Sequence, residues 1–240
     1  MKGLKALITG ASGGIGKAIC KALAGEGADL VLFGGTNAEK LNDFADELKT
    51  AYPDISVNSF PCDITDDDAV RAAFALAAKQ GVDILINNAG IAFGASVDNT
   101  DMEIFDRIMK VNFRAPVLIT KLALPYLRRS RRASVVNIVS VVAHRGYPMQ
   151  SAYSASKHAL LGFTESLAAE VYGENIRVHA VSPGGVYTDM IKITRPDLLG
   201  EGMIMPEDVA ETVLFLLKRR TSAVVDEILI RRAGKPPFSV

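Results

Sequence analysis

Short runs of apolar and β-branched residues alternate along the chain with longer segments in which apolar residues recur every three or four positions. The short runs are typical of buried strands, and the longer period is typical of helices. Strands are predicted at 5–9, 30–33, 56–60, 84–87, 134–140, 177–181 and 227–231, and helices at 14–25, 37–51, 66–80, 101–128, 153–172 and 206–219. This alternation predicts an α/β fold whose parallel sheet is covered by helices on both faces.

One segment departs from this pattern. Residues 188–205 contain two glycines and three methionines and show no clear periodicity, so we expect a substrate flap or a short helical insertion there. The rest of the chain contains no internal repeat and no low-complexity linker. A length of 240 residues therefore suits a single domain over 1–240 that binds the cofactor and carries the catalytic groups.

Composition argues against several classes of protein. Lys plus Arg and Asp plus Glu both number 27, so no basic excess points to a nucleic-acid partner, and the cluster RRSRR at 128–132 is predicted to be a solvated loop. No apolar run approaches the roughly 18 residues of a membrane span, and no signal peptide precedes the first strand. Cys20 and Cys62 are too few for a disulfide framework or a metal site. We expect a cytoplasmic protein without a membrane partner.

The glycine-rich stretch TGASGGIGKA, residues 9–18, follows the first predicted strand. It does not match a triphosphate-binding loop, because Ala11 replaces the first glycine and Ala18 replaces the serine or threonine that would hold magnesium. It also differs from G-x-G-x-x-G. Its spacing of Gly10, Gly14 and Gly16 still permits a tight turn, close backbone approach to a pyrophosphate, and tight helix–strand packing. The stretch therefore predicts a dinucleotide loop, with an ordinary strand–helix turn as the alternative.

Three further candidates are Tyr153, Lys157 and Ser140. Ser140 stands at the end of a predicted strand, where ligands bind in a parallel sheet. Tyr153 and Lys157 open a predicted helix at positions i and i+4, so they share one face. An ammonium group near a phenol favours the phenolate and lowers the tyrosine pKa, which suits proton exchange with a substrate oxygen. Ser140, at a strand end, has a hydroxyl that can bind the same oxygen. A surface Tyr–Lys pair and a turn serine are the alternatives.

The chain resembles the short-chain dehydrogenase/reductase family nearly from end to end. The resemblance rests on TGASGGIG (9–16), CDIT (62–65), NNAG (87–90), VN (111–112), Ser140, YSASK (153–157) and SPGGVYTDM (182–190). It implies a doubly wound Rossmann-type domain with a seven-stranded parallel sheet, usually assembled as a homodimer or homotetramer through the helices at 101–128 and 153–172. It also implies hydride transfer between NAD(P) and a carbonyl or secondary alcohol.

By this resemblance the catalytic residues are Asn112, Ser140, Tyr153 and Lys157. Tyr153 is the general acid/base, Ser140 polarises the substrate oxygen, Lys157 lowers the tyrosine pKa and holds the nicotinamide ribose, and Asn112 positions a relay water. Besides Tyr153 and Lys157, the implied cofactor-binding residues are Gly10, Ser12, Gly13, Gly14, Ile15, Gly16, Gly35, Thr36, Asp63, Ile64, Asn88, Ala89, Gly90, Pro183, Gly184, Val186 and Thr188. Asn87 is implied to hold the central sheet together.

The cofactor preference is not set by a charged residue. The segment FGGTNAEK, 33–40, has Gly35 and Thr36 where a carboxylate for NAD or an arginine for NADP is expected. Gly13 also stands where many NADP-dependent relatives carry a basic residue. Thr36, Asn37 and Lys40 offer a phosphate some hydrogen bonds and charge. The missing carboxylate favours NADP(H) slightly, and NAD(H) is the alternative.

The resemblance implies a small-molecule carbonyl or alcohol as substrate, with Val142, Tyr147, Gly185 and Met190 as its predicted contacts. Met149, Ile191 and Met203 extend a mostly apolar wall, and His144, Arg145 and Arg195 are candidates to meet a carboxylate, or else are simply exposed. The ending VVDEILIRRAGKPPF differs from the glycine-rich end of fatty-acid-synthesis reductases, which weakens the alternative of a 3-oxoacyl-thioester reductase. A non-catalytic dinucleotide sensor or scaffold is a further alternative. No metal site is predicted.

Overall fold

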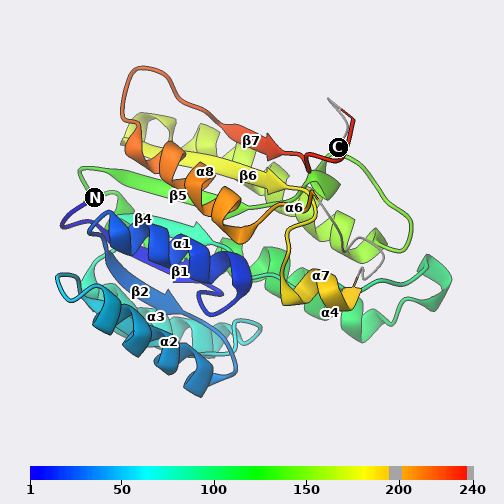
Figure 1. Cartoon of the computed structure of the whole chain (residues 1–240), viewed down its shortest axis with the longest axis horizontal. Coiled ribbons are helices and arrows are strands. Elements are labelled where there is room, and N and C mark those ends of the chain that lie inside the picture. Colours follow the sequence, from blue (N-terminus) through cyan, green and yellow to red (C-terminus); the bar gives the residue numbers. More distant parts are fainter. Residues whose placement is uncertain (195–201, 237–240) are drawn as a thin grey trace.

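The computed structural model describes residues 1–194 and 202–236. Its centre is a sheet of seven parallel strands in the order β3-β2-β1-β4-β5-β6-β7 (Figure 1). The strands are β1 (Lys5–Thr9), β2 (Asp29–Phe33), β3 (Val57–Phe60), β4 (Ile84–Asn87), β5 (Ala133–Ile138), β6 (Ile176–Pro183) and β7 (Glu227–Ile230). The predicted doubly wound Rossmann-type fold is confirmed.

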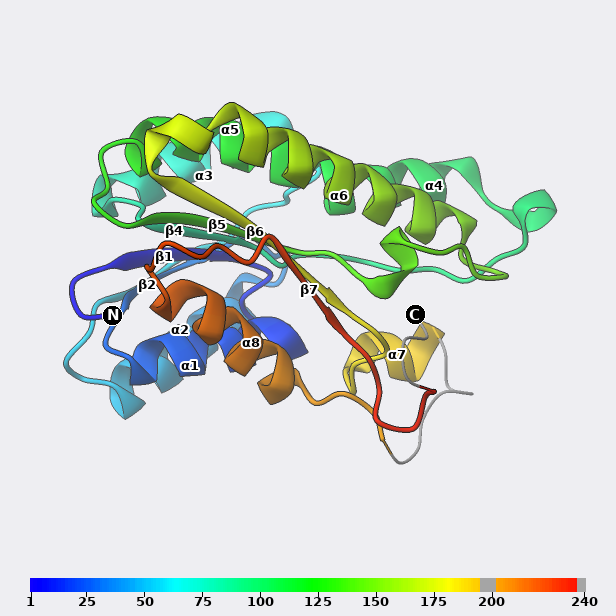
Figure 2. The same ribbon diagram turned by 90° about the horizontal axis from the view of Figure 1, so that it is seen from above.

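Helices cover both faces of this sheet (Figure 2). One face carries α1 (Gly14–Gly25), α2 (Ala38–Ala51) and α8 (Pro206–Lys218), and the other carries α3 (Asp67–Ala77), α4 (Met102–Met109), α5 (Ala115–Leu127) and α6 (Ser151–Glu170). Side chains of β1 alternate between the two faces, since Ala6 and Ile8 pack in the core beneath α1 while Leu7 packs in the core beneath α3 and α5. Burial on both faces explains the uninterrupted apolar runs of central strands such as β1 and β4.

The strand order reverses between β1 and β4. From β1 the chain first builds outward to β2 and β3, and then returns to place β4 on the other side of β1. Because all strands are parallel, their carboxyl ends and the loops that follow them meet at one edge. A crevice at such a reversal is where open α/β sheets bind ligands.

One predicted helix differs from the structure. The expected continuous helix at 101–128 is divided by a π-helical turn, Lys110–Arg114, between α4 and α5. The segment at 188–205, expected as a substrate flap or a short helical insertion, begins with a short helix, α7 (Asp189–Thr194), and residues 195–201 lie outside the described part of the chain. In the described ranges 1–194 and 202–236, no helix combines the length and apolar character needed to cross a bilayer. Nor does that part of the chain bring three potential metal-binding side chains together.

Candidate active site

The glycine loop connects β1 to the first turn of α1. Gly10 has a φ of +63°, which side chains other than glycine rarely adopt, and a Cβ there would lie 2.8 Å from Cα of Ala89. A Cβ at Gly16 would overlap the carbonyl oxygen of Gly10. At Gly14 it would lie 2.8 Å from Cγ2 of Thr188. The glycines therefore allow three chain segments to approach one another more closely than side chains would permit.

The N-terminus of α1 is available to an anion. Its N-cap residue, Gly13, provides no side-chain cap, and the first turn of the helix contains no acidic residue. Gly13 and Gly14 are exposed. The free N–H groups and the positive end of the helix dipole favour a phosphate at this place. The loop therefore fits the pyrophosphate of a dinucleotide.

Hydrogen bonds fix the glycine loop to the loop after β4. The side-chain Nδ2 of Asn88 donates to the carbonyl oxygens of Thr9, at 3.0 Å, and Gly10, at 3.1 Å. Oγ1 of Thr9 accepts from the backbone N–H groups of Asn88 and Ala89, both at 3.0 Å. Asn88 and Ala89, predicted as cofactor contacts, thus also hold the loop in shape.

We expect that Gly16→Ala lowers the free energy of unfolding by about 2–3 kcal/mol, because the new methyl group meets backbone that has no room to move. Gly25→Ala is the matched control, since Gly25 ends the same helix and a Cβ there meets nothing within 4 Å. Urea denaturation of both variants measures the difference. A Gly16→Ala protein as stable as Gly25→Ala would contradict this packing account.

The end of β2 carries no charged group where a ribose 2′-substituent is expected. Gly34 and Gly35 have φ values of +81° and +94°, and Gly35 and Thr36 are both exposed. Asn37 caps α2, with Oδ1 accepting from the backbone N–H of Lys40 at 2.8 Å. The cap uses only Oδ1 of Asn37, so its Nδ2 group can still donate to a phosphate, as expected from the sequence.

The predicted adenine contacts follow β3. Oδ1 of Asp63 accepts from the backbone N–H and the hydroxyl of Thr65, at 2.9 and 2.8 Å, and these bonds hold the pKa of Asp63 below its usual value. Ile64 is half-buried and packs closely against Gly34. A Cβ added at Gly34 would lie 2.8 Å from Cγ2 of Ile64. Asp63 therefore shapes a turn that presents Ile64 beside the end of β2.

A buried chain of amides and hydroxyls joins the centre of the sheet to the helices. Nδ2 of Asn87 donates to Oδ1 of Asn137 at 2.8 Å and to Oγ1 of Thr120 at 3.1 Å. Nδ2 of Asn137 in turn donates to Oγ1 of Thr164 at 2.7 Å. These bonds connect β4 and β5 with α5 and α6. The prediction that Asn87 holds the central sheet together is confirmed.

Asn112 lies in the π-helical turn and is fully buried. Its side chain pairs with the backbone of Ile91, since Oδ1 accepts from N–H at 2.8 Å and Nδ2 donates to the carbonyl at 2.9 Å. Nδ2 also lies 3.0 Å from Oγ of Ser156 on α6. Isolated π-helical turns are frequent at functional sites. Here the turn brings Asn112 between the loop after β4 and the helix that carries Tyr153 and Lys157.

Tyr153 and Ser140 meet in one cavity. Ser140 follows β5, and its hydroxyl lies 3.3 Å from the carbonyl oxygen of Pro183 and accepts from N–H of Val142 at 3.3 Å. Burial raises the pKa of Tyr153, and a hydrogen bond with Ser140 lowers it by less. The expectation of a lowered tyrosine pKa therefore does not hold for the protein alone. Desolvation of the phenolate is the stronger effect.

Lys157 is buried, with only 3% of its surface exposed. Its Nζ donates to the carbonyl oxygen of Ile138 at 2.8 Å and lies 5.8 Å from the centre of the Tyr153 ring. The ammonium is near the phenol without a hydrogen bond to it. Burial lowers the pKa of Lys157 to about 8. A Cβ at Gly90 would lie 3.7 Å from Nζ, so the glycine leaves space beside this charge.

These groups line a cavity of about 510 Å³. Ser140, Tyr153 and Lys157 lie in its wall, and so do the four predicted substrate contacts, Val142, Tyr147, Gly185 and Met190. The predicted cofactor residues in the wall are Ile15, Asn88, Gly90, Pro183, Gly184, Val186 and Thr188. Asn112, in the π-helical turn, is not in the wall. Nor are the remaining predicted residues, which lie in the glycine loop, the first turn of α1 and the loops after β2, β3 and β4: Gly10, Ser12, Gly13, Gly14, Gly16, Gly35, Thr36, Asp63, Ile64 and Ala89.

The predictions for the outer wall are met in part. Ile191 and Arg145 line the cavity, whereas Met149 and Met203 do not. Nε2 of His144 lies 2.8 Å from Oε1 of Glu227, so this histidine already has a carboxylate partner within the protein. Arg195 lies outside the described residues.

The last part of the wall is not among the residues predicted from the sequence. Arg231, Arg232, Lys235 and Pro236 line the cavity directly after β7. The rule that functional residues follow the carboxyl ends of parallel strands would have identified RRAGKPP, because these residues follow the seventh predicted strand.

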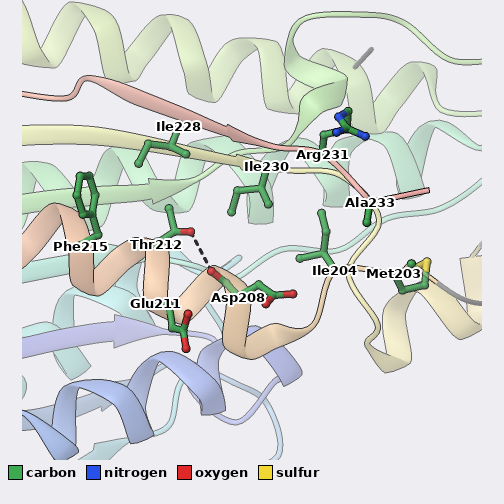
Figure 3. A pocket seen from close by; sticks show the side chains of 11 residues that line it. Met203, Ile204, Asp208, Glu211, Thr212, Phe215, Ile228, Ile230, Arg231 and Ala233 are labelled. Carbon is green, nitrogen blue, oxygen red and sulfur yellow. Dashed lines mark hydrogen bonds between the residues drawn. The ribbon is translucent and has the colours of Figure 1, made fainter. Parts of the chain in front are cut away.

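A second cavity, of about 580 Å³, lies between α8 and β7 (Figure 3). Its described lining includes Asp208, Glu211, Phe215 and Ile228 and contains none of the four predicted catalytic residues. Arg231 is part of both linings, so the segment after β7 separates this groove from the cavity that contains Tyr153. The first cavity is therefore the candidate active site.

Known proteins share both the sequence and the fold. Residues 4–198 match the family model described as short chain dehydrogenase. The chain is 34% identical over 240 residues to a 3-oxoacyl-[acyl-carrier-protein] reductase FabG of Thermotoga maritima, covering 95% of this chain and 96% of that protein. An alcohol dehydrogenase from the archaeon Thermococcus sibiricus, complexed with 5-hydroxy-NADP, has a TM-score of 0.88 at 26% identity, covering 98% of this chain and 99% of that chain.

A short chain dehydrogenase from Burkholderia cenocepacia J2315, in complex with NADP, has a TM-score of 0.86 at 31% identity, covering 95% of this chain and 96% of that chain. The family model spans most of the chain, and the similar proteins align with it over nearly their whole lengths. This chain belongs to the short-chain dehydrogenase/reductase family.

Proposed function

We propose that the protein is an oxidoreductase that reduces a carbonyl group, or oxidises the corresponding secondary alcohol, with Tyr153 as general acid/base. The observation that carries this proposal is the single cavity whose wall contains Ser140, Tyr153 and Lys157 together with Asn88, Gly90 and Thr188 from the loops expected to bind a dinucleotide. One domain thus supplies both the binding loops and the catalytic groups.

The chain's own groups account for the proton. In the reducing direction the Tyr153 hydroxyl gives its proton to the carbonyl oxygen, while the Ser140 hydroxyl donates a hydrogen bond to the same oxygen and orients it. A bound nicotinamide supplies the hydride, a chemistry that no side chain offers. The phenol of Tyr153 is protonated at neutral pH, and because burial raises its pKa, loss of the proton requires a group that stabilises the phenolate.

Lys157 and Asn112 support this transfer. The buried ammonium of Lys157, 5.8 Å from the Tyr153 ring, stabilises the phenolate that forms when the proton leaves, and its effect is strong because the site is desolvated. Asn112 holds the loop after β4 against α6 through Ile91 and Ser156. We propose that the π-helical turn around Asn112 positions the water that returns a proton toward Lys157.

A panel of ketones, aldehydes and secondary alcohols tests this function, with NADPH or NADH consumption and NADP⁺ or NAD⁺ reduction as the readout. We expect turnover of at least one carbonyl class with one of the two cofactors. Tight cofactor binding without turnover of any compound would instead favour the non-catalytic sensor or scaffold.

We propose that the preferred cofactor is NADP(H). Within FGGTNAEK no carboxylate stands at Gly35 or Thr36, where it would repel the 2′-phosphate of NADP. Both positions are exposed, so a 2′-phosphate can reach them. The Burkholderia cenocepacia structure, a complex with NADP, is consistent with this preference. Because this segment offers a 2′-phosphate only one basic side chain, Lys40, NAD(H) is the competing cofactor.

We expect that Thr36→Asp weakens NADPH binding about tenfold relative to NADH, because the new carboxylate repels the 2′-phosphate. Thr36→Asn has nearly the same shape without the charge and should leave the ratio of the two dissociation constants unchanged. Nicotinamide fluorescence titrations with both cofactors measure that ratio. An equal change for NADPH and NADH in the aspartate variant would show that no 2′-phosphate lies here.

Reduction of a 3-oxoacyl thioester is the second candidate substrate class. The Thermotoga maritima relative, named a 3-oxoacyl-[acyl-carrier-protein] reductase, favours it. The chain ending RRAGKPPFSV, which carries Arg231 and Arg232 into the cavity wall, differs from the glycine-rich ending expected for such reductases. Comparing kcat/KM for a 3-oxoacyl thioester with that for simple ketones distinguishes the two.

We propose that the protein forms a homodimer or homotetramer. Met102 on α4 is 63% exposed, Phe215 on α8 is 43% exposed in the lining of the second cavity, and Leu229 on the edge strand β7 is 44% exposed. Large apolar side chains that are exposed on helices and strands are candidates for burial between copies of the chain. Gel filtration with light scattering should give a multiple of 25.7 kDa, and a mass of one chain would contradict the proposal.

A further inference from the structure

The wall of the active-site cavity carries an excess of positively charged side chains. Arg145, Lys157, Arg231, Arg232 and Lys235 line it, and no Asp or Glu is part of the described lining. The whole chain has a net charge of zero, so this excess is local. Cations around an enclosed, mostly apolar space attract and hold anions.

Arg232 is the cation whose surroundings point most clearly to a ligand. Its side chain is half-buried beside the loop after β6, where a Cβ at Gly185 would lie 3.7 Å from its Cδ. Nη1 lies 3.5 Å from Sδ of Met203, a thioether that accepts hydrogen bonds weakly. No ion pair among residues 1–194 and 202–236 engages this guanidinium. A half-buried arginine ordinarily has a carboxylate or strong acceptors around it.

The neighbouring groups have other roles. Arg231 donates to the carbonyl oxygens of Arg232, at 2.9 Å, and of Lys235, and so shapes the turn after β7. The carboxylate of Glu227 accepts from Ser182 and pairs with His144. Arg145 and Lys235 line the cavity but are exposed, so they contribute long-range attraction more than fixed contacts.

We propose that the substrate carries an oxyanion, a carboxylate or a phosphate, and that Arg232 binds this group while the reacting carbonyl lies at Tyr153 and Ser140. This inference rests on the proposed carbonyl reduction. A guanidinium presents paired N–H donors that match the two oxygens of a carboxylate or phosphate. Arg232 is then a specificity-determining residue, and the cation-rich lining selects oxo acids or oxo phosphates over neutral ketones.

Matched substrate pairs test the charge preference directly. The 3-, 4-, 5- and 6-oxo acids are compared with their methyl esters, and hydroxyacetone phosphate is compared with hydroxyacetone, under saturating NADPH. We expect kcat/KM for the best acid to exceed that for its ester by about tenfold to a hundredfold. The two series distinguish a carboxylate from a phosphate.

Variants assign the preference to Arg232. In Arg232→Gln the ratio of kcat/KM for the acid to that for its ester should fall by about tenfold or more. The control is Arg129→Gln, an exposed arginine after α5 at the opposite edge of the sheet, and it should keep the wild-type ratio. The ratio is taken within each variant, so a loss of folded protein does not change it. If Arg232→Gln cannot be purified, raising the salt concentration from about 0.05 M to about 0.5 M should lower the wild-type ratio.

The outcomes separate this inference from the proposed function. Equal kcat/KM for charged and neutral partners would overturn the anion site and leave carbonyl reduction standing. A preference for the acids that persists in Arg232→Gln would overturn the role of Arg232. No turnover of any charged or neutral carbonyl, with either cofactor, would overturn the proposed function and this inference with it.

Discussion

Replacing Tyr153 by phenylalanine is expected to lower kcat for carbonyl reduction by about 10²–10⁴-fold, because the variant has no proton to give to the carbonyl oxygen. Ser140 keeps its hydroxyl, but its position beside the carbonyl oxygen of Pro183 suits it to hydrogen bonding, not to releasing a proton. The phenyl ring fills the same space, so the cavity keeps its shape and cofactor binding should change little.

Two measurements complete this test. Tyr172→Phe makes the same chemical change at a side chain that is 89% exposed at the end of α6, and it should retain wild-type turnover. Titration of Tyr153→Phe with the preferred cofactor should give a dissociation constant within about threefold of the wild type, well under the 1.4 kcal/mol of a tenfold change. Substantial turnover in Tyr153→Phe would remove the proton-transfer role from this residue.

Lys157→Met is expected to stabilise the fold at pH 7 while it lowers turnover. The pKa of Lys157 falls from 10.5 to about 8 on folding, because the ammonium is buried. Between these two values the unfolded chain binds more protons than the folded one, so the stability of the wild type rises with pH across this window. Below pH 8 the folded protein holds an unfavourable buried charge, at a cost of about 3 kcal/mol.

Methionine removes this charge but leaves the carbonyl oxygen of Ile138 without the 2.8 Å hydrogen bond from Nζ, which costs about 1–3 kcal/mol. The expected net gain at pH 7 is therefore about 0–2 kcal/mol, and it should turn into a net loss as the pH rises from about 8 to 10.5, because only the cost of the missing hydrogen bond then remains. Lys79→Met, at an exposed lysine, is the control and should show no such pH dependence.

Urea denaturation of the three proteins at several pH values measures these differences. A stability gap between the wild type and Lys157→Met that stays constant from pH 7 to pH 10.5 would show that Lys157 is not a buried cation. A lysine that costs stability while its loss lowers turnover is typical of a functional site, where activity is maintained at the expense of the fold.

The central strands of the sheet were predictable because they are buried on both faces. Full burial requires an uninterrupted apolar run, and such runs stand out between amphipathic segments, as with Ala6 to Ile8 in β1. The glycine loop was predictable for a related reason, since close approach of backbones requires glycine at Gly10 and Gly16.

Other features depend on tertiary packing and leave no local signal. A single π-helical turn around Asn112 has the same apolar periodicity as the helix it interrupts. The spacing of Tyr153 and Lys157 placed them on one face but could not show how deeply either is buried, which is why the direction of the tyrosine pKa was wrong for the protein alone. The position of Arg232 against Met203 likewise depends on where the chain after β7 packs.

The most direct test of the central claim is a titration of the purified protein with NADPH and with NADH, followed by nicotinamide fluorescence. The glycine loop, the uncapped N-terminus of α1 and the cavity that contains Lys157 predict saturable binding of one or both at micromolar concentrations. Tighter binding of NADPH would agree with the proposed preference. If neither cofactor binds, the stretch TGASGGIGKA is only a structural turn, and the assignment of this cavity as a nicotinamide-dependent active site is contradicted.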